Sequence, residues 1–116
     1  MHLTPAILRA AYVMLDECEP FSRWNLPDAD DIEFDVGKTK RDMACCHFYD
    51  QRKFRIMISQ AYCGILHTLF ENMAHEMIHV HIFRHPRMNR GGEHNAAWHR
   101  YADRVCKSFG FDRSRF

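Results

Sequence analysis

The sequence lacks long apolar runs, Cys-x-x-Cys pairs, internal repeats and low-complexity segments. Without a run of 18 or more apolar residues, no membrane span is expected. Residues 1–5 show neither the charged region nor the apolar region of a signal peptide, so we expect none. The five cysteines are odd in number, which favours reduced thiols in a cytoplasmic protein over a disulfide framework. Their spacing also excludes a cysteine zinc ribbon.

The length and the apolar content predict one domain covering residues 1–116. A chain of 116 residues has room for one core, and its 47% hydrophobic content is enough to fill that core. The hydrophobic pattern predicts the α+β class. We expect a small domain that contains an N-terminal helix, a three-stranded antiparallel sheet, a central helix and a C-terminal helix. Nothing in the sequence indicates an oligomeric state.

The boundaries of these elements follow from caps, alternation and turn residues. Thr4 and Pro5 form an N-cap and N1 pair that opens a first helix, expected to end at about Cys18. Alternating apolar residues predict strands, and the last two should form a hairpin around Asp50, Gln51 and Arg52. The expected strands cover residues 32–36, 44–49 and 53–59, and residues 60–67 are expected to be a short connection.

The most informative stretch is a His-Glu-x-x-His motif formed by His75, Glu76 and His79. On a helix, residues four apart lie on one face, so both imidazoles can reach one metal ion. Glu76 is rotated away from that face but can reach a water on the same ion and take its proton. A chance match is expected in about 3 to 4 per cent of shuffled versions of this chain. Buried histidines need partners for their ring nitrogens, which favours a metal site over core histidines.

The surrounding residues predict that this motif lies on a buried helix. Thr68 and Glu71 have the spacing of a capping box, which predicts a helix from about Leu69 to about Phe83. Apolar residues within this range recur at intervals of three and four, as on a helix with a wide apolar face. The motif therefore belongs to a helix that is largely buried.

A catalytic zinc site needs a third protein ligand and an open fourth position. After a loop that contains Gly91 and Gly92, Asn95 is an N-cap for a last helix that is expected to end at about Phe109, before Gly110. A ligand at the start of that helix can fold back over the motif. His94 is therefore the preferred third ligand, ahead of His99 and Glu93.

The run T-L-F-E-N-M-A-H-E-M-I-H at residues 68–79, with His94 fifteen residues after His79, resembles the SprT-like metalloprotease domain. The resemblance implies a zincin-like fold and one Zn²⁺ per chain, held by His75, His79 and His94. It also implies that Glu76 is the general base of a zinc endopeptidase. Its substrate would be a protein, and DNA-associated proteins are the substrates that the family suggests. The family has glycines on both sides of the third histidine, where this chain has Glu93 and Asn95.

The charges are distributed unevenly along the chain. Residues 1–35 contain two Arg and eight acids, whereas residues 84–116 contain eight Arg or Lys and three acids. Such a basic segment can attract nucleic acid or an acidic protein, although a solvated helix face explains residues 100–107 equally well. The candidate contacts are Arg84, Arg87, Arg90, Arg100, Arg104 and Lys107.

Two other functions remain open at this point. The first is a metal-stabilised module that binds nucleic acid or protein on a protease-like scaffold with little or no catalytic turnover. The second is an α+β interaction domain without metal, in which the His-Glu-x-x-His motif is accidental. Metal content and the effect of a Glu76→Gln change would distinguish these functions from the endopeptidase.

Overall fold

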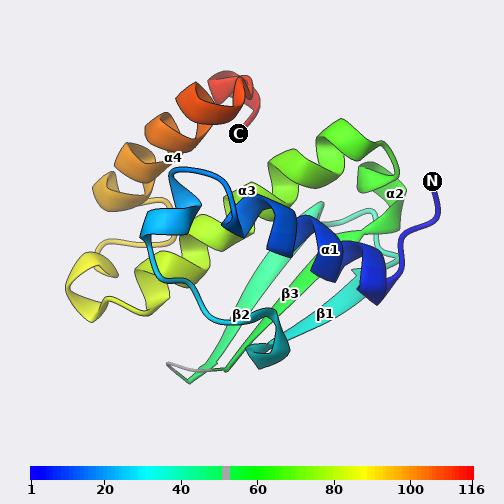
Figure 1. Cartoon of the computed structure of the whole chain (residues 1–116), viewed down its shortest axis with the longest axis horizontal. Coiled ribbons are helices and arrows are strands. Elements are labelled where there is room, and N and C mark those ends of the chain that lie inside the picture. Colours follow the sequence, from blue (N-terminus) through cyan, green and yellow to red (C-terminus); the bar gives the residue numbers. More distant parts are fainter. Residues whose placement is uncertain (51–52) are drawn as a thin grey trace.

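A three-stranded mixed sheet carries two helices on one face, and a third long helix lies outside them (Figure 1). The computed structural model describes residues 1–50 and 53–116. The helices are α1 (Pro5–Asp16), α2 (Gln60–Cys63), α3 (Leu66–Phe83) and α4 (Ala96–Phe109), and the strands are β1 (Ile32–Gly37), β2 (Ala44–Asp50) and β3 (Lys53–Ser59). The α+β class is confirmed. No helix in the described ranges is long and apolar enough to cross a membrane.

The sheet is mixed, so the expected antiparallel sheet is wrong. The strand order is β1-β3-β2, with β1 parallel and β2 antiparallel to β3. Strand β3 takes the centre because Phe54, Ile56 and Ile58 are fully buried and Met57 on its other face is only 9% exposed. Alternation in the sequence indicates which face of a strand is buried but not the direction of its neighbour. The expected turn at Gln51 and Arg52 lies outside the described residues.

Helix α1 packs against both α3 and β1. The Thr4 side chain accepts a hydrogen bond from the Ile7 amide at 3.2 Å, which confirms the expected cap. The helix ends at Asp16, two residues before the expected end at Cys18. Its inner face is buried against the core and consists of Leu8, Ala11, Tyr12 and Leu15.

The central helix α3 begins earlier than expected, at Leu66, and the expected connection before it contains the short helix α2. Thr68 lies inside α3 and caps nothing, because the N-cap is Ile65, which makes no side-chain cap hydrogen bond. The expected capping box is therefore wrong. The Glu71 carboxylate does not reach back to Thr68 and instead pairs with His67 and Arg115. The expected end at Phe83 is confirmed.

Helix α4 packs on α3 on the side away from the sheet, as Figure 1 shows. The Asn95 side chain accepts a hydrogen bond from the Trp98 amide at 2.9 Å, and Gly110 closes the helix with a φ of 77°. Both ends confirm the expectation from the sequence. Because α4 starts beside the last turns of α3, the segment before it lies close to the His-Glu-x-x-His motif.

Candidate metal centre

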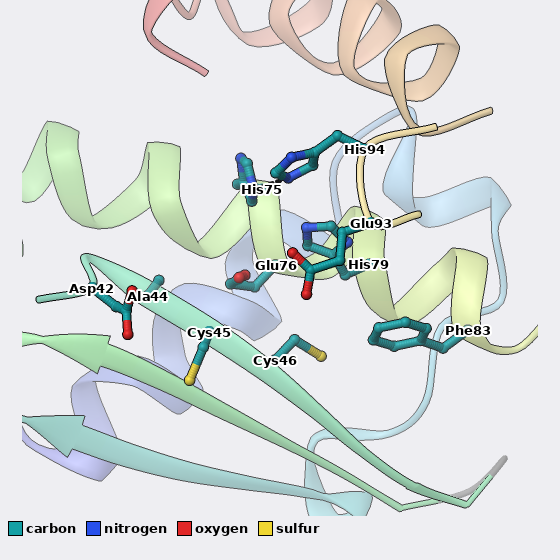
Figure 2. Close-up of a pocket in the computed structure, with 10 residues that line it drawn as sticks. All are labelled: Asp42, Ala44, Cys45, Cys46, His75, Glu76, His79, Phe83, Glu93 and His94. Carbon is teal, nitrogen blue, oxygen red and sulfur yellow. Dashed lines mark hydrogen bonds between the residues drawn. The ribbon is translucent and has the colours of Figure 1, made fainter. Parts of the chain in front are cut away.

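Helix α3 presents His75 and His79 on one face, as the spacing of four predicted. Their ring centroids are 5.1 Å apart. The helix is buried along most of its length, which leaves His79 only 7% exposed and His75 half-buried. The two imidazoles point toward the segment that connects α3 to α4 (Figure 2).

His94 completes a cluster of three histidines. Its Nε2 atom lies 3.1 Å from Nε2 of His75, and one ligand nitrogen from each of His75, His79 and His94 lies within 4.8 Å of the others. The other two candidates for the third ligand, His99 and Glu93, do not belong to this cluster. His99 accepts a hydrogen bond from Arg113 at 2.6 Å, and Glu93 lines the pocket as an exposed carboxylate.

Asn95 fixes the loop that carries His94. Its side-chain amide donates hydrogen bonds to the carbonyls of Met88 and Arg90, both at 2.7 Å, while its oxygen caps α4. Gly91 and Gly92 have φ values of 85° and 98°, a conformation that disfavours side chains. The loop therefore turns at the glycines and is tied to α4 immediately after His94.

Trp98 forms the wall behind the three histidines. It is 2% exposed, and its ring lies 4.7 Å from His75, 5.7 Å from His79 and 4.4 Å from His94. The contact of Trp98 with the three histidines was not predicted from the sequence. Its position one turn after His94 is the signal that could have revealed it.

Burial keeps two of the histidines neutral. It lowers the pKa of His75 from 6.5 to about 4 and the pKa of His79 from 6.5 to about 3. Nδ1 of His75 lies 2.6 Å from the main-chain oxygen of Phe116, so Nδ1 donates a proton to that oxygen. Nε2 of His75 then has a free lone pair that faces His94, as a metal ligand requires.

Glu76 is buried beside the cluster and is 4% exposed. Its Oε2 atom has no hydrogen-bond partner in the described part of the chain. Burial, and after it the charge of Glu93, raises the pKa of Glu76 from 4.5 to about 8. A cation bound by the histidines would stabilise the ionised carboxylate and lower that pKa again.

The cluster opens into a pocket of about 290 Å³ between α3 and β2. Figure 2 shows β2 along one side of the pocket and the histidines along the other. The lining residues include three acids and no Lys or Arg, and they are Asp42, Ala44, Cys45, Cys46, His75, Glu76, His79, Phe83, Glu93 and His94. A water or a peptide group in the pocket would contact both the histidines and Glu76.

The donor set fits a transition-metal ion. Zinc binds imidazole at about 2.0–2.1 Å, which places two ligands of a tetrahedral site about 3.3 Å apart. The distance of 3.1 Å between the Nε2 atoms of His75 and His94 is close to that value. Three imidazoles also suit other borderline metals, so the three histidines lie close enough to bind a metal ion but do not fix the element.

The candidate basic contacts do not line this pocket. Arg84 is the C-cap residue of α3 and donates a hydrogen bond to the Asn25 carbonyl. Arg87, Arg90 and Arg100 are exposed. Arg104 and Lys107 border a different pocket of about 460 Å³ between α4 and residues 19–24, which Glu19, Arg23 and Trp24 also line. The structure therefore separates the cationic residues of α4 from the histidine cluster.

The comparisons with known proteins leave the family open. No protein-family model matches the chain, and no curated protein matches it. The functional assignment therefore depends on the geometry of this site and on the sequence resemblance.

Proposed function

We propose that the protein is a zinc-dependent endopeptidase with a zincin-like domain of the SprT-like type. The observation that carries this proposal is the position of the buried Glu76 carboxylate on the pocket where His75, His79 and His94 converge. A metal site that served stability alone would need the ligands but no buried, unpartnered carboxylate beside them. That carboxylate favours an enzyme.

The three histidines would hold the ion and leave one position open toward the pocket. A bound zinc ion supplies the charge that acidifies a water molecule and polarises a peptide carbonyl. Glu76 accepts the proton from water and returns it to the leaving amine. Trp98 packs against the histidine rings and restricts their movement.

The resemblance suggests proteins associated with DNA as substrates. The exposed cations Arg87 and Arg90 belong to the segment between α3 and His94, where they could hold an anionic partner. We also propose a cytoplasmic location, since all five cysteines are free and a reducing compartment preserves them.

A second candidate function is a metal-stabilised module that binds nucleic acid or protein with little turnover. The observation in its favour is the pocket between α4 and residues 19–24, where Arg104 and Lys107 lie near Arg23, which pairs with Glu19. That pocket would bind an anion whether or not Glu76 performs chemistry.

The experiment that separates these functions compares Glu76→Gln with the wild-type protein. Zinc-loaded protein is incubated with a denatured protein substrate, with and without DNA, and cleavage is followed by mass spectrometry. We expect the wild type to cleave the substrate. At equal zinc content, the cleavage rate of Glu76→Gln should be lower by at least about a hundredfold. Glu33→Gln is the matched control, because Glu33 is an exposed carboxylate on β1. Equal cleavage by Glu76→Gln would reject the enzyme.

A further inference from the structure

Residues 111–116, called here the C-terminal strap, lie between α4 and the first half of α3. Besides the hydrogen bond from His75 to the Phe116 main-chain oxygen, the Phe116 ring lies 5.4 Å from His75 and 5.9 Å from Trp98. Phe111 stacks on Phe116 at 5.9 Å and on Phe109 at 5.4 Å. The strap thus packs against one metal-ligating histidine and against the wall behind it.

An ion pair ties the strap to α3 one turn before His75. Nη2 of Arg115 lies 3.6 Å from Oε1 of Glu71, and Nε2 of His67 lies 3.3 Å from the same oxygen. Glu71 is only 6% exposed, and its Oε2 atom has no partner among the described residues. A carboxylate that is so deeply buried needs a cation, and removal of that cation is costly. Glu71 therefore restricts the position of Arg115.

Arg115 immediately precedes Phe116, whose main-chain oxygen is the partner of His75. Holding the Arg115 side chain against α3 places this oxygen over the ring of His75. A histidine that binds a metal through Nε2 must carry its proton on Nδ1, and a fixed acceptor at Nδ1 selects that tautomer and orients the ring. Glu71, Arg115 and Phe116 form a chain of contacts that ends at the ligand.

We propose that Glu71 and Arg115 are positioning residues for the metal centre, which hold the Phe116 main-chain oxygen on Nδ1 of His75 and so present Nε2 to the ion. The inference rests on the proposed metal centre but not on peptide cleavage. Neither residue touches the pocket that Glu76 and the three histidines share. Their contribution is to the tautomer and direction of one ligand.

A purely structural role for the ion pair makes a different prediction. If Glu71 and Arg115 only anchored the strap, breaking the pair would lower the thermal stability and leave the tautomer of His75 unchanged. The first measurement therefore uses the metal-free protein labelled with ¹⁵N in histidine, in which NMR correlation through the ring protons distinguishes Nδ1-H from Nε2-H. We expect Nδ1-H at His75 in the wild type and a mixture of tautomers in Arg115→Ala and Glu71→Gln.

The second measurement is the zinc affinity, determined by competition with a chromophoric chelator. Loss of an outer partner of a metal-bound histidine weakens binding by roughly 10- to 100-fold, and we expect a loss in this range for Arg115→Ala. Arg115→Lys keeps a cation at Glu71 and should restore most of the affinity. Arg9→Ala breaks the exposed ion pair between Arg9 of α1 and Asp30. It should change neither the tautomer of His75 nor the zinc affinity.

The outcomes separate this inference from the proposed function. Circular dichroism and thermal unfolding first establish that each variant is folded, and Arg115→Ala carries the test if Glu71→Gln does not fold. An unchanged tautomer together with an unchanged zinc affinity in Arg115→Ala would overturn the inference. Zinc binding that depends on Arg115, in a protein that cleaves nothing, would support the inference and reject the endopeptidase. A wild type that binds no metal would overturn both.

Discussion

The Nε2 atoms of His75 and His94 lie 3.1 Å apart, although the two residues are separated by 19 positions in the chain. His75 belongs to α3, and His94 belongs to the segment that leads into α4. The Nδ1 proton of His75 is committed to Phe116, so its Nε2 lone pair faces the ring of His94. A cation between the two nitrogens would satisfy both rings.

This geometry predicts about one metal ion per chain in protein purified without a tag or chelator. His94→Ala removes one of three ligands and should weaken zinc binding by more than about a hundredfold. Elemental analysis and chelator competition measure this effect. His99→Ala is the control, because His99 bonds Arg113 and lies outside the cluster, and it should retain the metal. Equal metal content in the His94→Ala variant and the wild type would contradict the assignment of the third ligand.

The stability of the metal-free protein should pass through a maximum between about pH 6 and 7. Burial lowers the pKa of His75 and His81 to about 4 and that of His79 to about 3, each from 6.5. Below pH 6.5 these three histidines therefore bind more protons in the unfolded chain than in the folded chain, and the stability they contribute is lost as the pH falls toward 4 and 3. Urea unfolding at several pH values measures this decline.

Glu76 has the opposite effect on the stability, between pH 4.5 and 8. Burial raises its pKa from 4.5 to about 8, so the folded chain binds more protons than the unfolded chain between these values. The stability that this group contributes is fully present below pH 4.5 and is lost as the pH rises through 8. Glu76→Gln should therefore flatten the decline above pH 7 and steepen the rise between about pH 4.5 and 6.5, where Glu76 opposes the histidines. An alkaline decline of the same size in Glu76→Gln would show that another group causes it.

Asn95 should influence the metal affinity through two separable hydrogen-bonding roles. Asn95→Ala loses both the cap of α4 and the bonds to the Met88 and Arg90 carbonyls, and should cost about 1–2 kcal/mol of stability. Asn95→Asp keeps the capping oxygen but loses the amide donors to the loop. We therefore expect Asn95→Asp to retain most of the helix stability and to bind zinc more weakly, because the loop that carries His94 is no longer tied down. Calorimetric unfolding and chelator competition measure the two effects, and wild-type affinity in Asn95→Asp would argue against the tie.

Trp98 should contribute to both stability and metal affinity. Its truncation to Ala removes a fully buried ring and should cost about 3–5 kcal/mol, measured by urea unfolding of the metal-free protein. The histidine rings would also lose the surface against which they pack, so zinc affinity should fall. Trp24→Ala is the matched control, since Trp24 stacks on His81 at 4.5 Å and does not contact the cluster. It should lower the stability and leave the zinc affinity unchanged.

Local spacing in the sequence was enough to predict the features that depend on neighbouring residues. The interval of four between His75 and His79 places both on one face of any helix. The caps at Thr4 and Asn95 were also predicted correctly, because a cap involves only residues within one turn. Alternation in residues 53–59 identified a strand, and its alternating apolar residues Phe54, Ile56 and Ile58 are fully buried.

The same local reasoning failed where a contact with a distant part of the chain decided the structure. Thr68 and Glu71 have the spacing of a capping box, but α3 begins before them and Glu71 pairs with Arg115 instead. The expected antiparallel direction of β1 was also wrong. A strand pattern carries no information about which neighbour it joins, and β1 pairs in parallel with a strand that follows β2 in the chain.

The sequence by itself determined that this chain has a helix with His75 and His79 on one face and Glu76 beside them, because this arrangement follows from the period of the helix. Only the tertiary structure decided that His94 reaches them, that Trp98 backs all three rings, and that Glu71, Arg115 and Phe116 lead to Nδ1 of His75. These contacts join α3 to residues from 15 positions away, between His79 and His94, to 44 positions away, between Glu71 and Arg115. Contacts over such distances depend on how the helices pack on the sheet, and no local spacing encodes that packing.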